Sequence, residues 1–332
     1  MNDRDITGQD PAGGPLRPAP ELVVAGNLLV DDIVFHDGRT LMGEPGGGAL
    51  YVSLAASLWG VRVGLVSVLG VDYPAHAVEA LRAHGVDLAG VRVLAGSSLR
   101  SWLLYEKTGR RIIHQLGSPS HATVSPRIED FPDGFLGARV IHVCPMPFEY
   151  QRGLVVELAR TGVRGAAEAV PSAAVAVAAL SLDPHEPVRE DNLRLWKPLL
   201  ERLALFFVSH EELLLNGAAA DPGSALKRLT GRTVGQCFLL KRGDAGGLHL
   251  DADSEAFTPW TARGTPLDTT GAGDAFAGGV LAGRILGDSW ERALQRGVVS
   301  SSFAIESWGP RALIAATPET AERRLGAWAA LD

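Results

Sequence analysis

Short apolar segments typical of buried strands alternate with segments of helical periodicity along most of this chain. Residues 22–25 form one such apolar run, and residues 49–60 later place leucines at helical spacing before a final glycine. Strands buried on both faces are continuously apolar, and strands separated by helices usually pair in parallel. The alternation therefore predicts an α/β fold in which a mostly parallel central sheet is flanked by helices on both faces. Strands are expected at residues 22–25, 61–70, 138–144, up to 183, at 203–209, 236–243 and 247–253, and helices at 49–60, 74–84, 149–161, 188–202, 211–217, 289–306 and 318–330.

The pattern changes over residues 91–116, where two β-rich runs flank a Lys-Thr-Gly turn at 107–109. Glycine at such a turn indicates a hairpin, which is either an edge decoration or a flap over a site. No linker divides residues 21–330, so we expect a single domain to which residues 33–45 and 91–116 contribute a small β lid. Residues 1–20 are acidic and rich in Pro and Gly, and they are expected to form a flexible tail.

The composition excludes several classes of protein. The chain has 332 residues, of which 46% are hydrophobic and 21% charged, as in a soluble globular protein. Its net charge of −7 argues against a nucleic-acid partner or an anionic membrane surface. There is no run of about 18 apolar residues to span a bilayer and no apolar signal segment. Two cysteines cannot form a disulfide framework, so a cytoplasmic location is expected.

Familiar motifs of other enzyme classes are absent from the sequence. It contains neither the Walker A phosphate loop nor the protein-kinase catalytic loop, and no Cys or His motif for zinc. The nine histidines are scattered along the chain, and we assign them ordinary surface or core roles.

The segment DTTGAGDAFAGG, from Asp268 to Gly279, points to phosphoryl chemistry. Gly-x-Gly-Asp alone would occur by chance about 0.3 times in a chain with 39 glycines, so its setting matters. An extended segment enters this turn and an Ala-rich helix leaves it. The free N–H groups of the first helical turn and the helix dipole form an anion hole that Gly271 and Gly273 leave open. Asp274 could accept a hydroxyl proton there, or it could merely cap the helix.

Other motifs accompany this segment in a set order. They are Gly26 to Asp31, the pair Gly46-Gly47 before a helix, VLGVD at 68–72, the 91–116 hairpin, Asp183-Pro184 and Lys241-Arg242-Gly243. Together they resemble the PfkB (ribokinase-like) carbohydrate kinase family over about residues 21–315. The resemblance implies a ribokinase-like fold, the use of ATP and Mg²⁺, and phosphorylation of a hydroxyl on a sugar-like molecule. It also implies that Gly271, Ala272 and Gly273 form the anion hole and that Asp274 is the catalytic base.

On the acceptor side, the resemblance implies that Asp31 holds substrate hydroxyls and that Gly46 and Gly47 let the backbone approach a sugar ring. Asp31 lies just past a buried strand, where α/β folds bind ligands, although Asp32 is its structural rival. This chain has Tyr51 where the family often has Asn. Tyr51 removes an amide and offers an aromatic face, which favours a nucleoside acceptor if the ring stacks on a base.

On the nucleotide side, the resemblance implies contacts from Lys241, Gly243 and Thr270, with the helix at 297–306 beside the adenine. Gly243 could equally be an ordinary turn glycine. Arg100, Arg110 and Arg111 in the lid could reach a phosphate, but solvated charges are the simpler interpretation.

Two cation sites follow from the same resemblance. Glu212 is expected to order Mg²⁺ through water, although Ser209 stands where the family usually has Asn. Acids at a helix N-terminus are an alternative reading of Glu211 and Glu212. Asp268 is the candidate for a monovalent cation such as K⁺.

The sequence thus predicts an ATP-dependent carbohydrate kinase that acts on a sugar-like small molecule. Two alternatives stay open: a nucleoside kinase on the same fold, and a catalytically weak ligand-binding relative that acts as a sensor or partner. The apolar run at 102–105 in the lid would suit a homodimer, but it could also cover the protein's own site.

Overall fold

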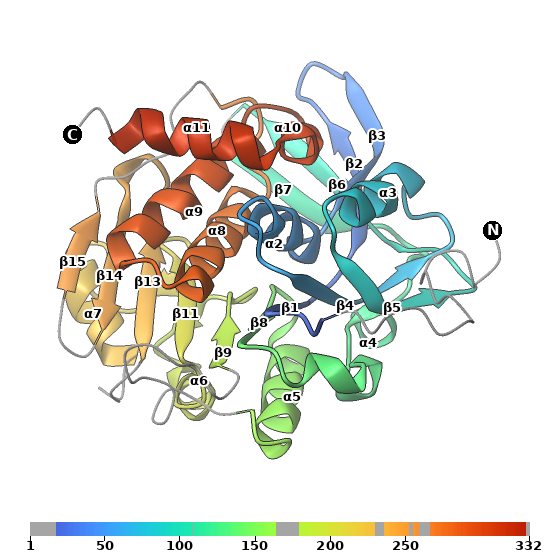
Figure 1. Cartoon of the computed structure of the whole chain (residues 1–332). Coiled ribbons are helices and arrows are strands. Elements are labelled where there is room, and N and C mark those ends of the chain that lie inside the picture. Colours follow the sequence, from blue (N-terminus) through green and yellow to red (C-terminus); the bar gives the residue numbers. More distant parts are fainter. Residues whose placement is uncertain are drawn as a thin grey trace.

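A nine-stranded central sheet runs through the part of the chain that the computed structural model describes, namely residues 18–107, 109–163, 179–229, 236–251, 255–258 and 266–329 (Figure 1). The strand order is β15 (Glu255–Thr258), β14 (Gly247–Asp251), β13 (Cys237–Lys241), β11 (Leu205–Ser209), β9 (Ala179–Leu182), β8 (Val140–Val143), β1 (Leu22–Ala25), β4 (Val63–Gly70) and β5 (Asp87–Leu94). Neighbours from β13 to β5 pair in parallel, whereas β14 and β15 add an antiparallel edge. The predicted mostly parallel sheet is confirmed. Of the predicted tail, residues 1–17 lie outside the described residues.

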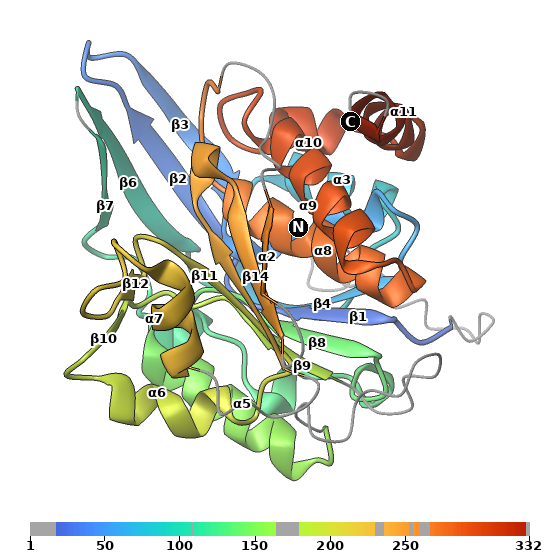
Figure 2. The same cartoon turned by 90° about the vertical axis from the view of Figure 1, so that its left-hand side faces the viewer.

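The sheet is buried on both faces, which explains why its strands are apolar at successive positions. In β1, Leu22 and Val24 pack into one core, and Val23 and Ala25 pack into the other. The first core is covered by α2 (Gly48–Ser57), α3 (Ala75–Ala83), α8 (Ala272–Leu286), α9 (Trp290–Ala304), α10 (Arg311–Ala315) and α11 (Pro318–Ala329), and the second by α5 (Phe148–Arg160), α6 (Leu193–Leu200) and α7 (Pro222–Leu229). Figure 2 shows these two helical layers on opposite sides of the sheet. None of the helices in the described ranges is long and apolar enough to cross a membrane.

Helix α8, which carries Asp274 in its first turn, is held by unusually close packing. A Cβ atom on Gly278 would lie 2.5 Å from the backbone oxygen of Val52 in α2. A Cβ on Gly279 would lie 2.6 Å from the backbone oxygen of Arg296 in α9. The glycines therefore let two helices pack on the backbone of α8, which fixes the helix below the candidate site.

A second, four-stranded sheet stands at the carboxyl edge of the central sheet. Its order is β3 (Thr40–Gly46), β2 (Leu29–Val34), β6 (Leu99–Glu106) and β7 (Gly109–His114). Strand β2 begins shortly after β1 ends, and β6 begins shortly after β5 ends. Ile33, Phe35 and Leu103 give it a small core of its own. We call this sheet the lid sheet (Figure 2).

Three segments differ from the sequence expectation. Residues 91–94, which were assigned to the lid, complete β5 in the central sheet. The predicted helix at 211–217 was wrong, because its buried Leu213 and exposed Leu214 form the short strand β12 (Leu213–Leu214). β12 pairs with β10 (Val188–Arg189), so the helix expected from 188 begins only at Leu193.

Candidate active site

The candidate site lies where the carboxyl ends of several parallel strands meet the N-terminus of α8. Asp183 follows β9, Ser209 ends β11 and Lys241 ends β13, while Asp31 lies in the lid strand that follows β1. Parallel α/β sheets bind ligands at this edge because loops and helix N-termini converge there. Residues far apart in sequence are thereby brought to one place.

Three backbone N–H groups of the Gly271–Asp274 turn, at the start of α8, have no backbone acceptor among the described residues, although that of Asp274 lies close enough to its own carboxylate to lower the pKa of that group against the effect of burial. Gly271 adopts a left-handed conformation with φ 74° and precedes the first residue of the fifteen-residue helix. In the described part of the chain, the N–H groups of Gly271, Gly273 and Asp274 have no backbone acceptor, whereas that of Ala272 donates to the Thr269 carbonyl at 3.2 Å. These three N–H groups lie at the positive end of a long helix, so the turn is suited to bind an anion through them and without the N–H of Ala272.

One carboxylate oxygen of Asp274 is shielded from solvent and has no protein partner among the described residues. Its Oδ1 atom is buried and accepts no hydrogen bond from the described residues. Helix α2 begins so close that a Cβ on Gly48 would lie 2.6 Å from this oxygen. Burial raises the pKa of Asp274 to about 6, against the nearby Lys241, which lowers it. A carboxylate with this pKa is mostly ionised at pH 7 and still basic enough to take a proton.

Lys241 places a fixed positive charge beside the anion hole. Its Nζ atom forms an ion pair with Asp183 at 2.5 Å and lies 3.2 Å from the point where a Cβ on Gly273 would be. Burial alone would lower the pKa of Lys241, but the carboxylates of Asp183, Glu212 and Asp274 raise it, so the lysine stays protonated. The Oδ1 atom of Asp183 is also buried without a hydrogen-bond partner in the described ranges.

The structure separates Asp31 from its rival Asp32. Asp32 accepts two hydrogen bonds from Arg100 at 2.6 and 2.7 Å and others from Gln115 and the Gly43 N–H, so its carboxylate is fully used inside the lid sheet. Asp31 is 6% exposed and receives no hydrogen bond from the described residues. A Cβ on Gly46 would lie 2.1 Å from its Oδ2 atom. Burial raises the pKa of Asp31 to about 7, although Arg110 lowers it.

Tyr51 does not offer the open aromatic face that was considered from the sequence. Its side chain is 2% exposed, and a Cβ on Gly271 would lie within 2.4–2.5 Å of three ring carbons. Burial, followed by Asp268, Asp31 and Asp274, raises the pKa of its hydroxyl, which stays protonated. Tyr51 therefore packs beneath the anion-hole turn, where no base could stack on it.

Asp268 and Thr270 connect the anion-hole turn to the lid sheet. Asp268 accepts hydrogen bonds from the N–H groups of Thr270 at 2.9 Å and Gly309 at 3.1 Å, and from the Tyr105 hydroxyl. The Thr270 hydroxyl lies 3.0 Å from that of Tyr105 and also accepts from Arg110. Arg110 thus reaches the site. The neighbouring Arg111 is exposed to solvent and pairs with Glu106 within the lid.

The remaining predicted residues lie around this centre with less definite contacts. Ser209 donates its N–H to Glu212 at 2.7 Å, and Glu212 is close enough to raise the pKa of Lys241 and Asp274. Gly243 has φ 57°, and a Cβ there would meet no atom within 4 Å, so its backbone conformation alone explains the glycine. No grouping of three or more His, Cys, Asp or Glu in the described ranges could hold a metal ion by itself.

Several residues of this region were not identified from the sequence. His114, His121 and His185 come together although they are scattered in the chain, and Asn27 joins them through His121. Asp183 was noted only within a motif, and Tyr105 only as part of an apolar run. Asn27 and His185 each follow the end of an apolar strand of the central sheet. Polar residues at such strand ends were the signal that could have marked both as candidates for the site.

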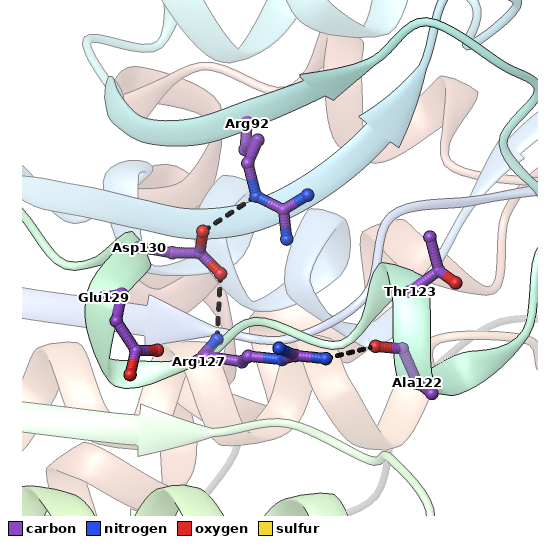
Figure 3. Close-up of a pocket in the computed structure, with 6 residues that line it drawn as sticks. All are labelled: Arg92, Ala122, Thr123, Arg127, Glu129 and Asp130. Atoms are coloured by element: carbon purple, nitrogen blue, oxygen red, sulfur yellow. Dashed lines mark hydrogen bonds and ion pairs between the residues drawn. The ribbon is translucent and has the colours of Figure 1, made fainter.

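A separate pocket of about 570 Å³ contains none of these residues (Figure 3). It is lined by Arg92, Ala122, Thr123, Arg127, Glu129 and Asp130. Both arginines are engaged, because Arg92 pairs with Asp130 at 2.8 Å and Arg127 donates to the Ala122 carbonyl at 2.9 Å. Arg92 is thus paired with a carboxylate, whereas Arg127 is held by a carbonyl oxygen.

Comparisons with known proteins agree with this geometry. A cytidine kinase from Thermococcus kodakarensis is 28% identical over 295 residues, covering 87% of this chain and 97% of that protein. A fructokinase from Salmonella typhimurium is 29% identical over 273 residues, covering 78% and 82%. Among solved structures, a ribokinase II from E. coli in complex with ATP and Mg²⁺ has a TM-score of 0.70 at 20% identity, covering 93% and 99%. The nucleoside kinase from Burkholderia thailandensis in complex with inosine has a TM-score of 0.68 at 20% identity, covering 92% and 98%.

These structural neighbours share the fold, and the predicted ribokinase-like architecture is confirmed. The model of the pfkB family carbohydrate kinases matches residues 22–316 of the chain. That match spans the lid sheet, the anion-hole turn and both halves of the central sheet. The protein is therefore a member of the PfkB family of carbohydrate kinases.

Proposed function

We propose that this kinase transfers the γ-phosphoryl group of ATP to a hydroxyl on the sugar ring of a small, uncharged acceptor. The observation that carries the proposal is the buried, unpartnered Oδ1 atom of Asp274 at the N-terminus of α8. An acceptor hydroxyl would supply the hydrogen bond that this oxygen lacks. It would thereby be oriented toward the anion hole, where phosphoryl transfer depends on positioning and electrostatic stabilisation.

Asp274 acts in this proposal as the general base. Its pKa of about 6 keeps it ionised at neutral pH, and it takes the proton from the attacking hydroxyl as the new O–P bond forms. Asp31 accepts hydrogen bonds from other hydroxyls of the same ring, since its carboxylate is also unpaired. The N–H groups of Gly271, Gly273 and Asp274 stabilise the negative charge of the transferred group.

The residues present fit ATP and Mg²⁺. Lys241 supplies a positive charge beside the anion hole, as a triphosphate requires. When bound, Mg²⁺ offsets the charge of the phosphates. Asp183 retains a free buried oxygen and Glu212 lies nearby, so both could accept hydrogen bonds from the metal's water shell. The E. coli structure that shares this fold holds ATP and Mg²⁺, which supports the same use here. A K⁺ site at Asp268 gains no support, because its carboxylate already accepts bonds from two N–H groups and Tyr105.

The lid sheet closes the site from one side in this proposal. Tyr105 of β6 donates a hydrogen bond to Asp268, and Arg110 of β7 donates one to Thr270, so both contact the anion-hole turn. Excluding water at this point protects the phosphoryl group from hydrolysis. The hydrogen bonds of Tyr105 and Arg110 to the turn couple lid closure to the geometry of the anion hole.

An ATP-consumption screen over sugars, polyols and nucleosides tests the proposal. Asp274→Asn is expected to lower kcat by about a hundredfold to ten-thousandfold while ATP still binds, because the general base is lost with little change of shape. The exposed Asp133→Asn serves as the matched control and should retain full activity. Near-normal turnover by Asp274→Asn would refute the assignment, and ATP binding without turnover of any acceptor would favour a sensor.

We also propose that the outer face of the lid sheet pairs two copies of the chain. Met42 on β3 and Ile113 on β7 are 50% and 46% exposed, so they offer apolar surface that a second copy could cover. Light scattering of the wild type and Ile113→Asp tests this pairing. A wild type that is monomeric at micromolar concentration would contradict it.

A further inference from the structure

Three histidines from distant parts of the chain meet beside the acceptor side of the site. His114 ends β7, His121 begins α4 (His121–Val124), and His185 lies in the loop after β9. The ring centroids of His114 and His121 are 4.9 Å apart, and those of His121 and His185 are 6.5 Å apart. The two Nε2 atoms of His114 and His121 are separated by 3.3 Å. We call His114, His121 and His185 the histidine cluster.

The histidine cluster continues the wall that begins at Asp31. Across the lid sheet, Asp31 pairs in register with Ser101, and Ser101 pairs with His114. Side chains of directly paired residues lie on the same face of a sheet, so Asp31, Ser101 and His114 form one row. The Ser101 hydroxyl lies 2.9 Å from Nδ1 of His114, in agreement with this row.

Asn27 ties the cluster to the glycine turn on the other side of Asp31. Its Nδ2 atom donates to Nδ1 of His121 at 3.2 Å. A Cβ on Gly47 would lie 2.2 Å from the backbone oxygen of Asn27, so the two residues are in direct contact. The Oδ1 atom of Asn27 is buried and has no hydrogen-bond partner in the described ranges. The wall is therefore incomplete without a ligand that donates a hydrogen bond.

The cluster suits an uncharged ligand. Burial, together with His114 and His185, lowers the pKa of His121 to about 4, and burial also lowers the pKa of His185. Among the lid arginines, Arg100 is paired with Asp32, and Arg110 donates to the Thr270 hydroxyl at the turn before α8. A phosphate or carboxylate placed against His121 and His185 would therefore meet neutral imidazoles rather than cations.

The same groups match a planar nitrogen heterocycle better than a second sugar. A neutral imidazole, as at His121 and His185, offers one N–H donor, one nitrogen acceptor and a flat aromatic face. Heterocyclic bases stack on such faces and form hydrogen bonds along their edges. A lone sugar ring would be held by Asp31 and the Gly46–Gly47 turn and would leave the histidines without a role.

We propose that His114, His121 and His185, together with Asn27, form a subsite for a neutral nitrogen heterocycle joined to the sugar ring that is phosphorylated. The acceptor is then a nucleoside. This inference rests on the proposed kinase function, because it names the substrate class of that same site.

The experiment compares nucleosides with bare sugars in wild type and histidine variants of the full chain. Cytidine, adenosine, ribose and fructose are tested as acceptors, and the binding of each is measured separately without ATP. We expect at least one nucleoside to have a kcat/KM tenfold or more above that of ribose. His114→Ala and His185→Ala should each raise the Kd of that nucleoside about tenfold, with a smaller change for ribose. His76→Ala, an exposed histidine on α3, is the matched control and should change neither value.

The outcomes separate this inference from the proposed function. If ribose or fructose is phosphorylated more efficiently than every nucleoside, the kinase function stands and the subsite is refuted. Equal weakening of nucleoside and ribose binding in the histidine variants would refute it as well. If no acceptor is phosphorylated but a nucleoside binds and the variants weaken that binding, the subsite stands and the proposed function fails. Circular dichroism of each variant checks that the fold is retained.

Discussion

Gly271 occupies a position at which the structure leaves no room for even one methyl group. A Cβ there would lie 2.4–2.5 Å from three carbons of the Tyr51 ring, about 1 Å closer than an ordinary contact. The left-handed φ of 74° would cost alanine about 1–2 kcal/mol. Overpacking against a buried ring adds about 1–3 kcal/mol. We therefore expect Gly271→Ala to lower the free energy of unfolding by about 2–5 kcal/mol.

The same substitution should damage catalysis more than binding. Either the ring or the turn must move by roughly 1 Å, and a displacement of that size at reacting groups can cost about a hundredfold in rate. Urea unfolding measures the stability loss, and steady-state kinetics measures kcat. Gly287→Ala is the matched control, because Gly287 has a φ of 86° at the other end of α8 and open space around its Cβ. It should lose only about 1–2 kcal/mol of unfolding free energy and keep its kcat.

A double-mutant cycle with Tyr51→Ala tests the cause of the effect. Removing the ring removes the clash, so the double variant should be more stable than the sum of the single losses predicts, by about 1–3 kcal/mol. If the two losses add within about 0.5 kcal/mol, the ring does not press on this turn and the reasoning is refuted. If Tyr51→Ala instead loses acceptor affinity without losing stability, Tyr51 contacts the substrate rather than supporting the turn.

Three further predictions follow from charges at the site. The proposed base must be ionised, and burial raises the pKa of Asp274 to about 6. We therefore expect kcat/KM to fall about tenfold per pH unit below pH 6 and to level off above pH 7. A flat profile down to pH 4 would contradict a carboxylate base. Asp32→Asn leaves the partly buried Arg100 without its ion pair and should lower the free energy of unfolding by about 2–3 kcal/mol, as urea unfolding would measure. Lys241→Met should raise the KM for ATP about tenfold. It should also move the acid limb of the pH profile to higher pH, because Lys241 lowers the pKa of Asp274. An unchanged acid limb would show that the charge of Lys241 does not act on the base.

Local patterns were enough to predict the central sheet and the anion-hole turn. Strands such as β1 and β4 are buried on both faces, and a continuous apolar run is a direct record of that burial. The turn at Gly271 and the proposed base Asp274 are neighbours in the chain, so one short segment contains both. The segment 211–217 misled because its leucines fit helical spacing as well as the alternation of β12.

Features that depend on distant partners could not be predicted from the sequence. The choice between Asp31 and Asp32 depends on Arg100, which is 68 positions away from Asp32 and occupies only that carboxylate. The histidine cluster joins positions 114, 121 and 185 through a lid strand, a short helix and a loop. None of these positions belongs to a periodic pattern, so only the folded chain reveals that they are neighbours.

Tyr51 and the histidine cluster together change the physical reason for expecting a nucleoside. From the sequence, the aromatic ring of Tyr51 was the feature that could stack on a base, yet that ring is buried under Gly271 and supports the anion hole. In the proposed subsite, imidazoles supply the aromatic surface near the acceptor instead and would add hydrogen bonds along a base edge. Under the two proposals, different residues recognise the heterocycle and support the phosphoryl group. Substitutions in the cluster should therefore alter acceptor choice, while substitutions at Tyr51 should alter stability and turnover.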